Sequence, residues 1–249
     1  VFNFIMAWAF ALIIMICVGY DKPVITDVMD GYPAQEAGLK AGDEIISLNG
    51  HKVHFYREVS MYSFFYPGKE VKVVYERDGE KHEVTLQPKL DEETGNYMMG
   101  ITGSLVRERG NVVETFTHSF YEVRYWINST VESLRLLITG GVSVNDLSGP
   151  VGIVKNIGDT YDASQSSGGA YLVFLSMLNI CIFLSANLGV MNLLPIPALD
   201  GGRLVFLIIE AIRGKRVNPE KEGMVHFIGL VALMALMVFV MFNDIRNIF

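Results

Sequence analysis

The stretch NLLPIPALDGG, residues Asn192–Gly202, places one carboxylate at the end of a long apolar run and behind two prolines. No side chain in residues 170–199 is ionised, and an Asp at membrane depth costs roughly 2.5–3.5 kcal/mol on insertion scales. Pro195 and Pro197 each remove a backbone donor and favour extended chain, which is tolerated at that depth beside a cavity or within protein. Asp200 is therefore either a functional group at membrane depth or an interfacial residue that caps the helix after it.

The same stretch resembles the LDG motif of the site-2 protease family, intramembrane zinc metalloproteases that include the bacterial regulator-of-sigma-E proteases. The resemblance implies that Asp200 is a zinc ligand and that Asn192 faces the active-site cavity, where it would bond substrate backbone or an oxyanion. It also places Pro195 and Pro197 in the substrate-binding part of the site. Asn187 is a further substrate-binding candidate on the same helix, although an interhelical hydrogen bond is the favoured interpretation for this residue.

Zinc-dependent hydrolysis of a peptide needs three protein ligands, an open position for water and a general base. In the family, the other two ligands and the base come from a His-Glu-x-x-His motif on an earlier helix, and this sequence contains no such motif. Residues Val1–Ile5 resemble the start of the family's second helix. We therefore expect this chain to be an incomplete, inactive fragment that holds one metal ligand, Asp200, and no catalytic residue of its own.

Three apolar runs give the chain a mean hydropathy of +0.33 and a hydrophobic content of 51%. They cover residues 1–19, 170–199 and 224–242, and each is near the ~20 residues that cross a hydrocarbon core. The first run lacks the basic start and small-residue cleavage site of a signal peptide, which favours a transmembrane helix. The apolar runs indicate that the protein lies in a lipid bilayer. The net charge of −7 argues against a nucleic-acid partner.

Basic residues between the second and third apolar runs set the expected orientation. The short segment there carries Arg203, Arg213, Lys215, Arg216 and Lys221, and the positive-inside rule places it in the cytoplasm. Three spans then place the large region between the first two runs outside the cytoplasm. We expect a multi-pass protein of the cell membrane whose active site lies toward the cytoplasmic side.

Residues 20–105 are predicted to form one small α/β domain. Apolar alternation and helical spacing predict strands at 23–28 and 42–50, a hairpin over 69–88, and helices at 33–39 and 56–66. The sequence PAQEAGLKAGDEI, Pro33–Ile45, is similar to the signature of PDZ domains in bacterial envelope proteases. The resemblance implies a groove that accepts a peptide end by β-augmentation, although the sequence does not identify the groove side chains.

Residues 106–169 are expected to connect this domain to the second apolar run. Apolar spacing predicts an amphipathic helix over Asn111–Thr139. The segment LSGPVGI, Leu147–Ile153, then interrupts any helix and resembles the family segment that precedes the LDG helix. The polar, Ser- and Gly-rich residues 159–169 are predicted to be a mobile linker. Within the PDZ-like domain, His51 and His54 are expected to be solvated surface residues.

These features predict a multi-pass α-helical membrane protein with an inserted extracytoplasmic α/β PDZ-like domain. The expected segments are a transmembrane helix (1–19), the PDZ-like domain (20–105), an amphipathic helix and linker (106–169), a transmembrane helix with the LDG motif (170–200), a cytoplasmic loop or short helix (201–223) and a transmembrane helix (224–243).

The resemblance implies a zinc-dependent intramembrane endopeptidase acting in regulated intramembrane proteolysis. Its substrates would be single-pass membrane proteins, with an anti-sigma factor as one candidate, and the PDZ-like domain would gate their access by binding a peptide end. The alternative is a catalytically inactive, membrane-anchored PDZ scaffold. The missing His-Glu-x-x-His motif favours the scaffold, whereas the intact Asn192–Gly202 motif opposes it.

Overall fold

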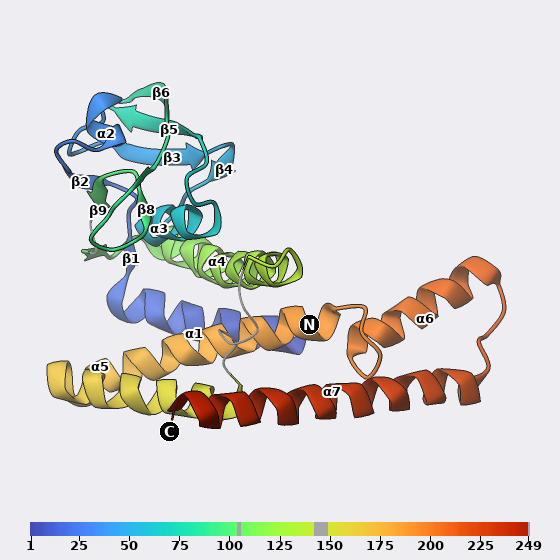
Figure 1. Ribbon diagram of the computed structural model, residues 1–249. Coiled ribbons are helices and arrows are strands. Elements are labelled where there is room, and N and C mark those ends of the chain that lie inside the picture. Colours follow the sequence, from blue (N-terminus) through green and yellow to red (C-terminus); the bar gives the residue numbers. More distant parts are fainter. Residues whose placement is uncertain (104–105, 142–148, 249) are drawn as a thin grey trace. The chain divides into compact units, whose positions relative to one another are not determined.

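The computed structural model describes residues 1–103, 106–141 and 149–248, with the backbone alone at 247 and 248. The chain divides into two compact units, one of Ala11–Tyr125 and one of Val1–Phe10 with Trp126–Phe249. The strands belong to the first unit, and the second is helical (Figure 1).

The elements follow one another as the hydrophobic patterns predict, with shifts at their ends. The helices of the described residues are α1 (Phe2–Val18), α2 (Pro33–Glu36), α3 (Tyr56–Phe65), α4 (Val112–Ile138), α5 (Pro150–Leu193), α6 (Asp200–Arg213) and α7 (Pro219–Ile248). The strands are β1 (Tyr20–Asp21), β2 (Ile25–Val28), β3 (Glu44–Leu48), β4 (His51–Lys52), β5 (Val71–Arg77), β6 (Glu80–Leu86), β7 (Lys89–Leu90), β8 (Tyr97–Met98), β9 (Ile101–Gly103) and β10 (Arg107–Glu108). Helix α2 is shorter than the predicted 33–39 because Gly38 adopts a φ of 79°, which a helix cannot continue through.

A four-stranded antiparallel sheet of order β4-β3-β5-β6 carries the core of the Ala11–Tyr125 unit (Figure 1). Strands β5 and β6 pair in unbroken register, and the connecting residues Asp78 and Gly79 both have positive φ, 53° and 81°. This is the turn geometry that matches the twist of the flanking strands, so the predicted hairpin is confirmed. The inward side chains form a buried cluster that includes Ile25, Ile45, Leu48, Val59, Val71, Val73 and Met99.

Asp43, within the PDZ-like signature, is a buried carboxylate that fastens the sheet to the segment after α2. It accepts hydrogen bonds from Arg77 Nε at 2.6 Å and Nη2 at 2.7 Å, and from the Lys40 backbone N–H at 2.8 Å. Arg77 Nη2 also reaches the Gly38 carbonyl at 2.9 Å. A carboxylate this buried is stable only with such partners. The ion pair therefore connects the end of β5 to the segment between α2 and β3.

The first half of α4 belongs to the sheet-containing unit. Its start is fixed by a capping box in which Asn111 Oδ1 accepts the Glu114 N–H and Glu114 Oε2 accepts the Asn111 N–H, both at 2.9 Å. Further along, the buried Glu122 pairs with Arg57 of α3. The predicted helix over Asn111–Thr139 is therefore confirmed, and its first half is attached to α3 by a buried ion pair.

His54 lies in the same contact, which corrects the expectation that it is solvated. Its ring stacks on Tyr121 of α4 with centroids 3.6 Å apart, and its Nε2 lies 3.3 Å from Arg124 Nη1. Burial, followed by the positive charge of Arg124, lowers the pKa of His54 to about 4. The expectation was wrong because the residues that cover His54 come from α4, far along the chain. His51 is exposed on β4, as predicted.

In the helical unit, α5 consists of two helices that meet at Gly169, and the first of them corrects the expected linker. Residues 159–168 are helical. The chain turns back at Gly169, which has φ 63° and ψ −157°, and the Ser164 hydroxyl donates to Ser176 Oγ at 2.8 Å across this turn. The hydroxyls of Thr160 and Ser166 each donate to the carbonyl four residues earlier, both at 2.7 Å. Because such hydroxyls bond back to the helix, a Ser-rich composition did not prevent helix formation here.

Helix α5 begins inside the Leu147–Ile153 segment, at Pro150, so this segment does not end helical structure as predicted. Leu147 and Ser148 lie outside the described residues. The start of the helix is held by α7, because Asp244 accepts hydrogen bonds from the N–H groups of Gly149 and Gly152, both at 2.9 Å. A carboxylate is favoured at this position because the first N–H groups of a helix have no partner within it.

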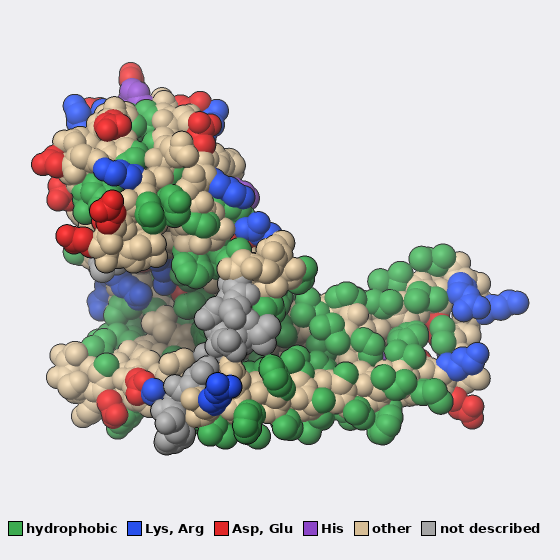
Figure 2. Space-filling view, in the orientation of Figure 1, with side chains coloured by type: hydrophobic (Ala, Val, Ile, Leu, Met, Phe, Trp, Pro, Cys, Tyr) green, Lys and Arg blue, Asp and Glu red, His purple; other side chains and the backbone are tan. Residues whose placement is uncertain are grey.

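Within the described residues, two helices are long and apolar enough to cross a membrane, α5 and the Pro219–Arg246 part of α7. Helix α1 is a shorter apolar helix of 17 residues. Helix α7 begins five residues before the predicted span at 224, and the expected segment 201–223 consists largely of α6. Figure 2 shows hydrophobic side chains along α6 and α7, with Lys and Arg gathered where the two helices connect. Such exposed apolar surface suits a lipid environment.

Candidate functional site

The LDG stretch forms a tight turn between α5 and α6. The chain becomes extended at Leu194, with φ −62° and ψ 141°, and re-enters a helix at Asp200. Gly201 is buried where an added Cβ would lie 2.2 Å from the Leu194 carbonyl oxygen and 2.4 Å from that of Leu193. Only glycine fits so close to the end of α5, so the chain folds back on the helix that it has just left.

Asp200 opens into a small polar cavity of about 380 Å³. Its walls come from the turn, from the start of α6 and from the start of α7. The residues that line it with Asp200 are Ala198, Leu199, Arg203, Pro219, Glu222, Gly223 and His226. One acidic side chain of α7 and one basic side chain of α6 therefore share this cavity with the Asp200 carboxylate.

The geometry does not support the capping interpretation of Asp200. The N-cap of α6 is Leu199, which forms no side-chain cap hydrogen bond, and Asp200 is the first helical residue. Among the described residues, no hydrogen bond or ion pair involves the Asp200 carboxylate. The carboxylate is thus available to an external ligand, and the positive end of the α6 dipole favours its negative charge.

The predicted substrate-binding residues lie apart from this cavity. Asn187 accepts a hydrogen bond from Thr130 of α4, which is the interhelical bond that the alternative interpretation predicts. Asn192 is half-buried and Pro195 is exposed. Pro197 lies against α7 and lines a neighbouring apolar cavity of about 490 Å³. A substrate-binding role for these four residues stays a prediction.

The donor set at Asp200 fits zinc in part. Zinc in a catalytic site takes three protein ligands of the His, Cys, Asp or Glu type. Asp200, Glu222 and His226 line one cavity, but across residues 1–103, 106–141 and 149–248 no three such side chains are placed so that they could hold a metal ion. His226 is the imidazole of the cavity, and its Nδ1 already accepts a backbone hydrogen bond. The described residues therefore offer Asp200 as one ligand and do not complete a zinc site.

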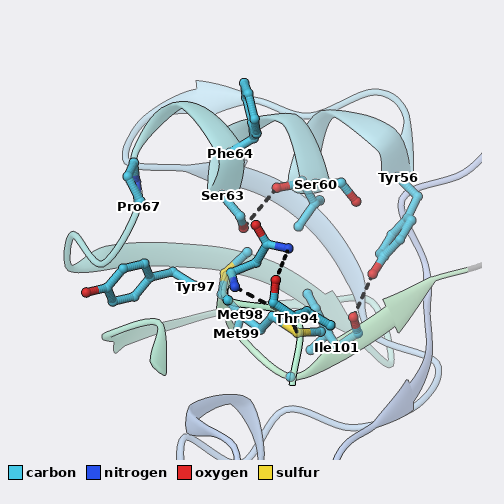
Figure 3. Close-up of a pocket in the computed structure, with 14 residues that line it drawn as sticks. Tyr56, Ser60, Ser63, Phe64, Pro67, Thr94, Tyr97, Met98, Met99 and Ile101 are labelled. Carbon is cyan, nitrogen blue, oxygen red and sulfur yellow. Dashed lines mark hydrogen bonds between the residues drawn. The ribbon is translucent and has the colours of Figure 1, made fainter. Parts of the chain in front are cut away.

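A second candidate site is a groove in the Ala11–Tyr125 unit, between α3 and the segment 94–101, with a volume of about 620 Å³ (Figure 3). Helix α3 contributes Tyr56, Val59, Ser60, Ser63 and Phe64, and Pro67 lies two residues beyond its end. The opposite wall is continuous chain from Thr94 to Ile101, which leads into β9. This wall contains β8 and the first residue of β9.

The two ends of the groove differ. At one end the Tyr56 hydroxyl donates to the Ile101 carbonyl at 2.8 Å, and at the other end lie Pro67 and Tyr97 (Figure 3). Gly103 follows on β9, where an added Cβ would lie 1.9 Å from the Tyr56 ring. Burial raises the pKa of Tyr56 to about 12, so the hydroxyl remains a donor at neutral pH. The bond therefore covers the Ile101 carbonyl and bounds the groove on that side.

Sequence reasoning did not identify these groove residues. The signal that was present is the helical spacing of Tyr56, Val59 and Ser63, which places them along one face of α3. The opposite wall had no comparable signal, because residues 94–101 contain two glycines and show no sustained helical or strand periodicity.

The comparisons with known proteins identify the family. The model of peptidase family M50 matches residues 1–236, and the chain therefore belongs to this family, the site-2 proteases. Zinc metalloprotease RasP of Geobacillus kaustophilus is 39% identical over 249 residues, which cover 99% of this chain and 57% of the relative. The regulator of sigma-W protease RasP of Bacillus subtilis is 36% identical over 251 residues, which cover 100% of this chain and 58% of the relative.

The chain thus spans a little over half the length of these two relatives. The predicted family is confirmed, and zinc is the metal named for the Geobacillus relative. Among solved structures, the PDZ domain of an SdrC-like protein from Listeria monocytogenes is 27% identical, with a TM-score of 0.31. That similarity covers 34% of this chain and 90% of the domain.

Proposed function

We propose that this protein is a zinc-dependent intramembrane endopeptidase in which Asp200 is one of the zinc ligands. The observation that carries the proposal is the partnerless carboxylate at the first residue of α6, in a polar cavity at the end of a long apolar helix. Asp200 is exposed to this cavity, and a carboxylate at membrane depth usually marks a functional site. Membership of family M50 supplies the class of reaction.

The turn performs two tasks in this proposal. It presents the Asp200 carboxylate at the positive end of α6, which helps to keep it ionised as a ligand. It places polar residues of α6 and α7 around the carboxylate, so that water can enter an otherwise apolar region. Bound zinc would polarise the scissile carbonyl and lower the pKa of its bound water. The scissile segment has to be extended there, because a helix encloses its own carbonyl groups.

The groove between α3 and residues 94–101 is the proposed receptor for a peptide end, through which the PDZ-like domain gates access. The substrates would be single-pass membrane proteins. An anti-sigma factor is a candidate, because the Bacillus subtilis relative is named as a regulator of sigma-W protease. The basic residues between α5 and α7 support an orientation with the Asp200 cavity toward the cytoplasm and the groove on the other side of the cell membrane.

The test is cleavage of a single-pass model substrate by the intact protein carrying Asp200→Asn. Loss of a zinc ligand should lower cleavage by on the order of a hundredfold or more while the protein stays folded. The matched control is Asp162→Asn, which neutralises an exposed carboxylate of α5 and should leave cleavage unchanged. Retained cleavage in the Asp200 variant would contradict the proposal, and an uncleaved substrate with the unaltered protein would favour the scaffold alternative.

A further inference from the structure

The turn before Asp200 contains a backbone conformation that needs outside support. Ala198 has a φ of 77°, in the left-handed region that residues with a Cβ rarely adopt. It stands two residues before Asp200 and directly after Pro197, whose ring fixes the preceding dihedral angle. The left-handed residue therefore determines the direction in which the chain enters α6.

His226 of α7 supplies a support at that position. Its Nδ1 accepts the Ala198 N–H at 3.0 Å. A neutral imidazole that accepts at Nδ1 carries its proton on Nε2. The Nε2 atom is buried without a hydrogen-bond partner among the described residues, and Glu222 Oε1 lies 4.0 Å away. One hydrogen bond therefore connects the imidazole ring to the turn.

A second contact with the same helix lies one turn further on. An added Cβ on Gly229 would lie 2.5 Å from Pro197 Cβ and 2.6 Å from the Pro197 carbonyl oxygen. Residues three apart lie on the same face of a helix, so His226 and Gly229 form one surface against the turn. Helix α7 thus contacts Pro197 through bare backbone and Ala198 through the imidazole.

We propose that His226 is a positioning residue that holds Ala198 in its left-handed conformation and thereby directs the Asp200 carboxylate into the cavity. The inference rests on the proposed role of Asp200 as a zinc ligand. His226 acts here through its acceptor atom and through the backbone, and it is not itself a ligand. The support matters because a ligand held in place binds metal more tightly than one that must be ordered on binding.

The experiment measures zinc affinity by chelator competition in the full-length, detergent-purified protein, because the described residues alone do not complete a zinc site. His226→Leu removes the acceptor and should weaken zinc binding by about tenfold to a hundredfold, as loss of a group behind a ligand does. His226→Asn keeps an acceptor the same number of bonds from the backbone, and its affinity should stay within about threefold of the unaltered protein. Phe227→Leu, at an exposed neighbour on α7, is the matched control and should change nothing.

A double variant separates positioning from packing. Glycine adopts positive φ without a Cβ penalty, so adding Ala198→Gly to His226→Leu should restore most of the lost affinity. A role of His226 in packing alone would not be rescued in this way. If the Leu variant does not fold, His226→Gln replaces it, because its longer side chain moves the acceptor away from the Ala198 N–H.

The outcomes also separate this inference from the proposed function. Normal zinc binding by His226→Leu, or failure of the Ala198→Gly rescue, would overturn the role of His226. If Asp200→Asn loses zinc in the same assay, the proposed function stands despite that result. If Asp200→Asn also keeps zinc at unchanged affinity, the proposed function fails as well.

Discussion

The groove between α3 and residues 94–101 and the Asp200 cavity are built in different ways. The groove lies within a unit that has a sheet, a buried apolar cluster and a buried ion pair between Asp43 and Arg77. The Asp200 cavity lies on helices whose apolar side chains are largely exposed, and its shape depends on a turn with two prolines, two glycines and one left-handed alanine. The shape of the groove should therefore depend on the stability of the whole Ala11–Tyr125 unit. The shape of the cavity should depend on the backbone geometry of the turn before Asp200.

The largest effect that would sharpen this contrast is expected from Arg77→Leu. The change leaves the buried Asp43 carboxylate with the Lys40 N–H as its remaining partner, and should lower the free energy of unfolding of the Ala11–Tyr125 unit by about 2–4 kcal/mol. Chemical denaturation measures the loss. Lys72→Leu is the control, because its pair with Glu83 is about half exposed and should contribute less than about 1 kcal/mol. Equal losses in the two variants would show that the Asp43–Arg77 pair contributes no more to the free energy of unfolding than an exposed pair does.

A smaller effect is expected from filling the groove with Ser63→Trp. The side chain of Ser63 lies on the groove face of α3, and an indole there would occupy space that a peptide needs (Figure 3). Binding of a fluorescent peptide ending in Ala-Val-Ala-Val should weaken by at least about tenfold, or about 1.4 kcal/mol, by anisotropy titration. Thr85→Trp, at an exposed position of β6, should leave binding unchanged. Unaltered binding in the Ser63 variant would place the peptide site elsewhere.

The smallest effect concerns pH. The pKa of His54 is lowered to about 4 in the folded protein, so below about pH 6.5 the unfolded chain binds a proton that the folded chain does not. The free energy of unfolding should therefore fall as the pH drops from about 6.5 to 4, by about 1 kcal/mol or less because His54 is partly exposed to solvent.

His54→Gln should remove this part of the pH dependence, and His51→Gln, at an exposed position, should retain it. Glu58 contributes with the opposite sign, because burial raises its pKa, but its contribution is present in both variants and cancels in the comparison. An unchanged pH profile in His54→Gln would mean that the contact with Tyr121 and Arg124 does not form in solution.

The fold of the sheet-containing unit was largely predictable because its signals are local. The Asp78-Gly79 turn, the alternation in β5 and β6 and the spacing in α3 each show in a few neighbouring residues. The surroundings of His54 and the pairing of Arg57 with Glu122 were not predictable, because they depend on α4 packing against α3. The linker expected over 159–169 failed because composition alone does not separate a polar helix from a loop.

The candidate site divides in the same manner. Asp200 and its turn follow from the Asn192–Gly202 motif, and the interhelical bond of Asn187 follows from a polar residue in an apolar helix. The contact of His226 with Ala198 was beyond sequence reasoning, because nothing local marks an alanine as left-handed or selects its partner on α7. The groove wall of residues 94–101 was missed for the same reason.

The most direct test of the central claim is the zinc content of the intact protein, purified with and without Asp200→Asn and measured by mass spectrometry of the metal. Because the described residues supply one ligand, the measurement uses the full-length protein. We predict near-stoichiometric zinc in its unaltered form and a loss of most of it in the variant, with both proteins folded. Equal zinc content in the two proteins would contradict the assignment of Asp200 as a metal ligand.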